Sequence, residues 1–222
     1  MKIFKYILLS LAVFAVGFAA TVIFLNSRTK NTESVIIVTP RSEATNQITS
    51  AFSLENAPSE SLRGQITAMT GEIDWTDRVA TEASKISSPV TIQQGEELST
   101  GLKSSLILEF LNTCTVKFSQ STDIQIIQTL PTNLVFAQIS GTGEYIKTGS
   151  DPVSVRALNL LTNVEGDTVI SINQLKPIIT LTVKSGTATV AYNDLKYLSH
   201  EVTISAGHTY TFNSGTRRGV LK

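Results

Sequence analysis

The sequence predicts an all-β lobe, built as an antiparallel sandwich or as a β-roll or solenoid, behind one N-terminal transmembrane helix. Residues 6–25 form an apolar run in which only Ser10 and Thr21 are polar, and from residue 63 onward short alternations of apolar and polar residues are separated by turn residues. These observations divide the chain into a cytoplasmic N-terminus (1–5), a transmembrane signal anchor (6–26), a flexible linker (27–62), a β lobe (63–213) and a C-terminal tail (214–222).

The apolar run of residues 6–25 carries no charged side chain. A bilayer core is about 30 Å thick and a helix rises about 1.5 Å per residue, so about 20 apolar residues span it. A cleaved signal peptide, with Ala15, Ala19 and Ala20 near the cleavage site, and a buried core helix are the alternatives. Strongly apolar residues 22–25 follow these alanines directly, which favours an uncleaved anchor. No Glu lies near the start of the run, which excludes a close match to type IV pilins.

The charges that flank the anchor do not decide its orientation. Lys2 and Lys5 precede it, and Arg28 and Lys30 follow it. Size decides instead, because only residues 1–5 precede the helix and most of the polar chain follows it. We therefore expect a single-pass protein of the cell membrane with a cytoplasmic N-terminus and an extracytoplasmic lobe.

Composition narrows the classes of partner. Lys plus Arg and Asp plus Glu number 18 each, so the formal net charge of zero offers no electrostatic footprint for nucleic acid. The single cysteine, Cys114, cannot form an intramolecular disulfide, and its phase among apolar neighbours predicts burial rather than an intermolecular bridge. Residues 27–62 are rich in Ser, Thr, Asn, Glu and Pro, which favours a spacer, although the apolar island 35–38 leaves a stray strand or a membrane contact open.

The clearest strand pair covers residues 106–110 and 114–118, with Asn112 and Thr113 at the hairpin connection. Residues 80–88 predict at most a short helical turn, and residues 141–144 a loop. Further strands are predicted at 65–69, 72–75, 90–93, 123–128, 134–139, 154–158, 168–172, 178–184, 187–192, 201–205 and 209–212.

Several segments follow one another in a recognisable order. They are QGEELSTG (94–101), SSLILEF (104–110), TVKF (115–118), VKSGTATV (183–190) and ISAGH (204–208). This order resembles the FecR-type extracytoplasmic domain over roughly residues 63–213. The resemblance implies a β fold with backbone reversals at Gly101, Gly186 and Gly207, where glycine tolerates a left-handed φ.

The chain departs from that family in three respects. Asn112 and Thr113 replace its Asp-Gly hairpin, and residues 166–169 match its Gly-Thr strand poorly. Regulatory members also carry a cytoplasmic domain that engages a sigma factor, whereas only residues 1–5 precede the helix here. We therefore do not expect this polypeptide to control transcription directly.

The sequence offers few candidates for catalysis. His200 and His208, with Glu201 nearby, lack the ligand spacing of a zinc site. Ser185 lies beside Gly186 without the flanking residues of a nucleophile elbow. We expect no catalytic residue, no cofactor and no metal, and the binding residues are unknown.

Two further segments are poor candidates, one for a catalytic carboxylate pair and one for a phosphate-binding loop. Glu96 and Glu97 are adjacent, so on a strand their side chains point to opposite faces and cannot cooperate. The closely spaced glycines of residues 141–144 lack the strand-to-helix context of a phosphate loop.

The aromatic residues allow two interpretations. Trp75, Tyr192, Tyr197 and Tyr210 are expected to pack within or between strands, and the alternative is a platform on which a sugar ring stacks. The basic residues 215–222 are expected to form a solvated end, or to contact acidic cell-wall polymers.

The resulting hypothesis is a non-catalytic binding or scaffolding module at the cell envelope, with an envelope protein or a cell-wall glycan as its partner. The alternative is a sensor that signals through its helix, where Gly17 and neighbouring alanines offer a small-residue face for helix association. An envelope enzyme is the third class, and it would depend on His200 and His208.

Overall fold

The computed structural model describes residues 60–173 and 175–222. The anchor predicted at 6–26 lies outside the described residues, as does the linker up to residue 59. The described part of the chain contains no helix that is long and apolar enough to cross a bilayer. Its regular elements are all strands, which confirms the all-β prediction.

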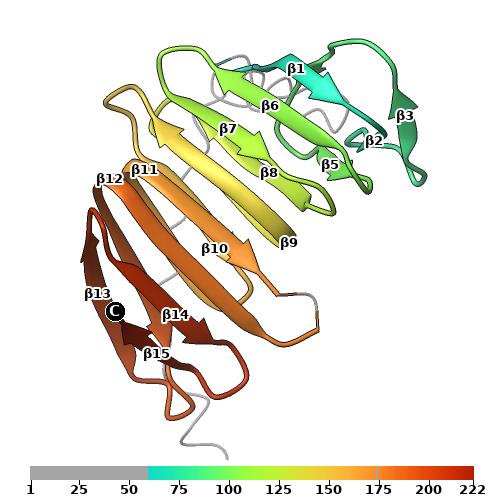
Figure 1. The fold of residues 1–222 in the computed structure, drawn as a ribbon. Coiled ribbons are helices and arrows are strands. Elements are labelled where there is room, and N and C mark those ends of the chain that lie inside the picture. Colours follow the sequence, from blue (N-terminus) through green and yellow to red (C-terminus); the bar gives the residue numbers. More distant parts are fainter. Residues whose placement is uncertain (1–59, 174) are drawn as a thin grey trace, which may run out of the picture. The chain divides into compact units, whose positions relative to one another are not determined.

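All the strands belong to one connected sheet, in which several neighbours are not consecutive in the chain (Figure 1). They are β1 (Gly64–Thr70), β2 (Ile73–Thr76), β3 (Ser84–Ile86), β4 (Thr91–Ile92), β5 (Glu97–Thr100), β6 (Ser105–Phe110), β7 (Cys114–Phe118), β8 (Asp123–Leu130), β9 (Asn133–Lys147), β10 (Val153–Ala157), β11 (Leu160–Ile172), β12 (Ile178–Asn193), β13 (Ser199–Ser205), β14 (Thr209–Asn213) and β15 (Arg218–Leu221).

Three long strands, β9, β11 and β12, change neighbours halfway along their length. Residues 133–140 of β9 pair with β8 and β10, whereas residues 141–147 pair with β7 and β11. The halves of β12 similarly pair with β14 and then with β13. The sheet therefore has two rows, which we call row A (β3-β2-β5-β8-β9-β10-β11-β12-β13) and row B (β4-β1-β6-β7-β9-β11-β12-β14-β15).

The hydrophobic core lies between the two rows. Phe110 of row B and Phe136 of row A have ring centroids 5.7 Å apart, and Phe136 lies 5.6 Å from Tyr145, which belongs to row B. All three side chains are fully buried. Along β6 and β7 every second residue is buried, as the period-two alternation of the sequence predicts.

One strand pair departs from the expected antiparallel arrangement, because β9 and β10 are parallel. The first half of β9 lies in row A and its second half continues into row B. Residues 148–152 then lead back to row A, so β10 repeats the direction of the first half of β9. The sheet is therefore mixed, although every other pairing in the described lobe is antiparallel.

Two glycines hold positions that differ from the sequence expectations. Gly186 does not reverse the chain, because it lies inside β12 with a φ of 73°, where the strand passes from row B to row A. Gly141 has a φ of 76° at the corresponding point of β9, so residues 141–144 belong to a strand and not to a loop. Gly207 does lie in a reversal, between β13 and β14.

Three further segments were also wrongly predicted. Residues 84–86, expected to form at most a short helical turn, are β3, and residues 97–100, for which no strand was predicted, are β5. The C-terminal tail contains β15, which pairs with β14 from Arg218 to Leu221. The hairpin at Asn112 is confirmed, and Asn112 itself takes the left-handed φ of 59° that Thr113 would tolerate poorly.

Candidate functional site

A surface groove of about 390 Å³ lies where the β10–β11 turn, the end of β12 and the β14–β15 turn meet. We call it the C-terminal groove. It is lined by Arg156, Leu158, Asn159, Leu160, Leu161, Ala191, Tyr192, Asn193, Ser199, His200 and Arg217.

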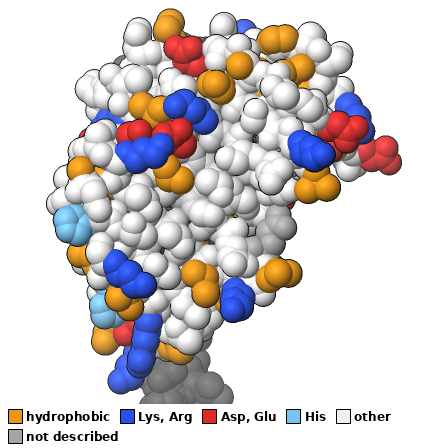
Figure 2. All heavy atoms as spheres, viewed as in Figure 1, with side chains coloured by type: hydrophobic (Ala, Val, Ile, Leu, Met, Phe, Trp, Pro, Cys, Tyr) orange, Lys and Arg blue, Asp and Glu red, His pale blue; other side chains and the backbone are white. Residues whose placement is uncertain are grey.

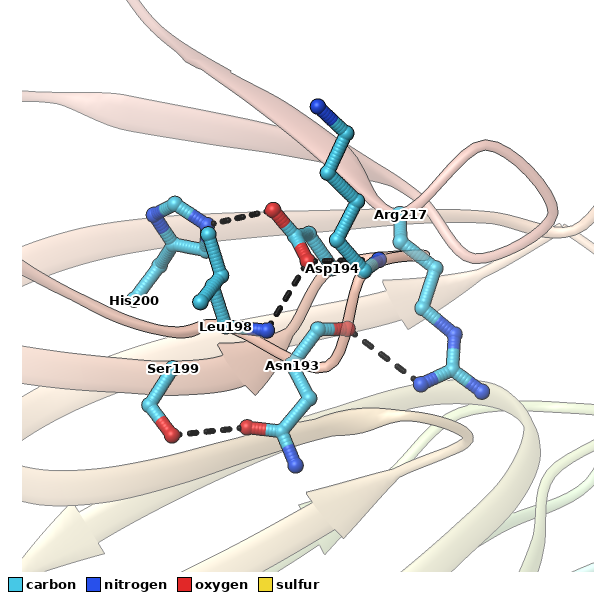
Figure 3. Close-up of polar contacts among 7 residues, drawn as sticks. Asn193, Asp194, Leu198, Ser199, His200 and Arg217 are labelled. Carbon is cyan, nitrogen blue, oxygen red and sulfur yellow. Dashed lines mark hydrogen bonds and ion pairs between the residues drawn. The ribbon is translucent and has the colours of Figure 1, made fainter.

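The carboxylate of Asp194 organises the β12–β13 turn beside this groove (Figure 3). One of its oxygens accepts hydrogen bonds from the backbone N–H groups of Lys196 (2.8 Å) and Leu198 (3.0 Å). The other oxygen lies 3.0 Å from Nε2 of His200. These contacts lower the pKa of Asp194, and the hydrogen bond from His200 is the largest cause. Asp194 therefore stabilises the β12–β13 turn by accepting these hydrogen bonds.

Two side chains connect the turn to the strands around it. The hydroxyl of Ser199 donates to Oδ1 of Asn193 over 2.9 Å, and Nη1 of Arg217 donates to the backbone carbonyl of Asn193 over 3.2 Å (Figure 3). These bonds hold the guanidinium of Arg217 at the end of β12.

The floor of the groove rests on an aromatic stack. The ring of Tyr192 lies nearly parallel to that of His200, with centroids 5.2 Å apart, and 4.7 Å from the buried ring of Phe212. At the other side of the groove Nδ2 of Asn159 donates to the hydroxyl of Ser214 over 2.8 Å. The strands and turns that line the groove are therefore connected to one another.

The lining carries positive charge without acidic side chains. It contains the guanidinium groups of Arg156 and Arg217, and no Asp or Glu. Within residues 60–173 and 175–222 neither arginine forms an ion pair. In Figure 2 the lower part of the visible face shows Lys, Arg and His side chains with little acidic surface among them.

Exposed apolar side chains surround the same end of the lobe. Tyr197 is 84 % exposed on the β12–β13 turn, beside Leu195 and Leu198. Leu158 and Leu161 are exposed at the groove itself. The backbone of the β12–β13 turn is held by hydrogen bonds to Asp194, so its exposed apolar side chains form a fixed apolar edge beside the C-terminal groove.

A second, smaller hollow of about 210 Å³ lies over β2, β5 and β8. Asp74, Glu97 and Asp123 contribute to its lining, but Asp123 accepts hydrogen bonds from the hydroxyls of Ser99 and Ser140. Across the described ranges no three His, Cys, Asp or Glu residues are placed to hold a metal ion.

A charged cluster occupies the outer surface of row B. Glu144 pairs with Lys117 at 3.2 Å and also with Lys184. The hydrogen bond from Lys184 is the first cause of the lowered pKa of Glu144. Burial is the first cause of the raised pKa of neighbouring Asp167. These charges lie on β7, β9, β11 and β12 and tie the strands together.

The two histidines do not form a common site. His200 is the second residue of β13 and pairs with Asp194, whereas His208 follows the other end of β13 and contacts the carbonyl of Ala206. Cys114 is buried, as predicted, and burial raises its pKa to about 12. That thiol is not poised as a nucleophile.

The remaining candidates have structural roles in the described lobe. Glu96 is buried and Glu97 is exposed, so the two point to opposite sides as expected. The indole of Trp75 is half-buried and packs against the core. Tyr210 is buried beside Gly219 of β15, and Tyr197 alone among these tyrosines is mostly exposed.

Sequence reasoning missed Arg156 and Asn159 as groove residues. The alternation Val153-Val155-Ala157 places Arg156 on the outward face of β10, which is a signal that the sequence contains. Arg217 was recognised only as part of a basic tail.

No family model matches the chain, and no curated protein matches it. Two crystal structures of a candidate anti-sigma factor from Parabacteroides distasonis ATCC 8503, at 2.50 and 1.65 Å resolution, are similar to it with 13% sequence identity and a TM-score of 0.48. The similarity covers 57% of this chain and 58% of that one, so the matched region spans less than two thirds of either protein.

Proposed function

We propose that this chain is a single-pass membrane protein whose FecR-type β lobe lies outside the cytoplasm and acts as a non-catalytic binding or scaffolding module of the cell envelope. In this proposal residues 6–26 are the signal anchor and residues 27–62 the spacer. The lobe is a two-layered sandwich of the roll type, because its long strands pass from one row to the other.

The observation that carries the proposal is the C-terminal groove. It is a built surface, in which Asp194, Asn193 and Asn159 fix the turns by hydrogen bonds. It presents arginines that no carboxylate neutralises within the described lobe. Guanidinium groups that form no ion pair suit the recognition of an anionic partner.

The placement outside the cytoplasm is tested on the full chain. Membranes are separated from the soluble fraction, and intact cells or spheroplasts are treated with a protease. We expect the chain in the membrane fraction and the lobe to be cleaved from outside. Recovery of the intact chain in the soluble fraction would overturn the proposal.

Binding is tested with the same membrane-extracted chain. Purified protein is incubated with separated envelope proteins and with wall glycans, and the bound material is measured for each. Binding to either class supports a binding module and tells protein scaffolding from glycan attachment. If neither class binds, the binding role is wrong even where the placement holds.

A sensor that signals through the membrane is the second candidate. It rests on the small residues Ala15, Gly17 and Ala19, which would let two helices approach closely. The change Gly17→Ile should then weaken association of the full chain in membranes, measured by crosslinking. Unchanged association removes this route and leaves the binding module.

A further inference from the structure

The C-terminal groove combines two kinds of recognition group. Arg156 and Arg217 supply planar guanidinium groups, each of which can hold two oxygens of a carboxylate or phosphate. Asn159, Asn193 and Ser199 supply neutral donors and acceptors next to them. We propose that this groove binds the acidic units of an envelope polysaccharide.

The charge of the site favours an anionic ligand. Two acidic side chains lie outside the lining: Asp194 of the adjacent turn, whose oxygens accept from Lys196, Leu198 and His200, and Glu201, which pairs in register with Ala191. Arg217 uses Nη1 for the carbonyl of Asn193, which orients the guanidinium and leaves its other N–H groups for a ligand. An oxyanion would therefore meet positioned donors and no acidic lining residue.

The neutral side chains favour a saccharide over an acidic peptide. Nδ2 of Asn159 donates to Ser214, so its Oδ1 is left as an acceptor. Oδ1 of Asn193 accepts from Ser199, so its NH₂ group is left as a donor. Each sugar unit carries several hydroxyls that both donate and accept, whereas an acidic peptide offers one backbone N–H and one C=O per residue beside its carboxylates, so a saccharide complements this mixed set more densely.

The size of the groove is consistent with short saccharide segments. Ligand sites in proteins commonly have volumes of about 300–1,000 Å³. At about 390 Å³ the C-terminal groove lies at the small end of that range. It would hold a few units of a polymer whose ends continue over the surface.

The inference rests on the proposed function, because the lobe must face the envelope to meet such a polymer. The test uses the full chain in detergent micelles and four probes. These are polygalacturonate as a carboxylate polysaccharide, poly(glycerol phosphate) as a phosphate polymer, dextran as a neutral glycan and poly-L-glutamate as an acidic peptide. Affinities are measured by biolayer interferometry at two salt concentrations.

Arg156→Gln and Arg217→Gln are compared with Arg218→Gln. Arg218 is the neighbour of Arg217 and is exposed, but it does not line the groove, so its change removes the same charge elsewhere. We expect each groove variant to weaken binding about tenfold, which corresponds to about 1.4 kcal/mol, and the control to change it less than about twofold. Arg156→Lys keeps the charge but loses the planar fork, so it should fall between wild type and Arg156→Gln. Circular dichroism verifies that each variant is folded.

The outcomes separate the possibilities. Binding of polygalacturonate, lost in the groove variants, supports the proposal. A preference for poly(glycerol phosphate), which has no sugar ring, would assign the groove to a phosphate polymer instead, and equal binding of dextran would show that the acidic group is not recognised; either result overturns the proposal. Equal losses in Arg218→Gln would show diffuse charge attraction and overturn it. Tighter binding of poly-L-glutamate would assign the groove to an acidic peptide, and binding of no acidic probe would also overturn the inference.

The proposed function remains valid if the C-terminal groove turns out not to be the binding site. If a double variant, Arg156→Gln with Arg217→Gln, still binds envelope material as the wild type does, the groove is not the site but the lobe remains a binding module. If the chain fails the fractionation test, the proposed function fails whatever the groove binds.

Discussion

The indole N–H of Trp75 donates to Oε2 of Glu96 over 3.0 Å, and this joins the end of β2 to a buried carboxylate just before β5. The same oxygen accepts the backbone N–H of Gln93 over 3.0 Å. One buried acidic side chain thus satisfies two donors from different segments.

Glu96→Ala should destabilise the lobe because both donors lose their acceptor in a buried setting. We expect a loss of about 1–3 kcal/mol in the free energy of unfolding. Urea denaturation measures it, and the emission of Trp75, the single tryptophan of the chain, reports the transition. The control is Glu97→Ala, whose exposed side chain should matter little; equal losses in both variants would contradict the role of Glu96.

The pH dependence of stability should reveal the burial of Glu96. Burial raises its pKa, so the folded state holds the proton more tightly than the unfolded chain does. The contribution of protonated Glu96 to the free energy of unfolding is complete below the pKa that Glu96 has in the unfolded chain. It is lost as the pH rises through the pKa that Glu96 has in the folded protein. Relative to Glu96→Gln, the wild type should therefore gain stability as the pH is lowered from neutral to the ordinary glutamate pKa of 4.5. A difference that stays constant over this range would refute the assignment.

Glu144 should show the opposite sign. The pKa of Glu144 is lowered by Lys184 and Lys117. Its contribution to stability is therefore present above the pKa that Glu144 has in the unfolded chain, and it is lost as the pH falls through the pKa in the folded protein. Glu144→Gln should cost up to about 1 kcal/mol at neutral pH and less in high salt, because the pairs are partly exposed. Glu72→Gln, which removes the exposed partner of Lys85, serves as the control and should leave the unfolding transition unchanged.

Gly186, where β12 passes from row B to row A, should not tolerate a side chain. In Gly186→Ala the new Cβ would lie 2.2 Å from the backbone oxygen of Glu165, at a φ of 73°. We expect a loss of about 3 kcal/mol or more. Gly207→Ala is matched in φ, at 83°, but has nothing within 4 Å of the new Cβ, so it should cost only about 1 kcal/mol. Thermal unfolding of both variants checks this, and equal losses would mean that the close approach at Gly186 is unimportant.

Cys114 should be inert in the folded protein. It is fully buried and its pKa is raised to about 12, so little thiolate is present at pH 8. Iodoacetamide should label it only after denaturation, as followed by mass spectrometry. An added cysteine in the exposed β14–β15 turn, Thr216→Cys, should react at once and shows that the reagent works. Rapid labelling of Cys114 in the native protein would contradict its burial.

The local β pattern could be predicted where each strand borders the core on one face. Residues 106–110 and 114–118 alternate strictly, and β6 and β7 match those ranges closely. The pattern is weaker in Ser84–Ile86, where no side chain is fully buried, and that strand was missed. The alternation of β15 is also weak, because it is an edge strand with mostly exposed residues.

Long-range geometry could not be predicted in the same way. A glycine with positive φ suits a hairpin and a bent strand equally, so Gly186 alone does not tell the two apart. The groove likewise depends on residues 156–161, 191–200 and 217, which only the sheet pairing brings together. The sequence did show the outward position of Arg156, but not its neighbours.

The passage of β9, β11 and β12 between the rows has a consequence for dissecting the lobe. Each of these strands shares its hydrogen bonds between both layers, so a cut anywhere from residue 133 to residue 193 would leave two fragments with incomplete sheets. Neither fragment would enclose an apolar interior by itself. Truncation series and split reporters should therefore keep this stretch whole, and the molecule should lose its structure in a single step.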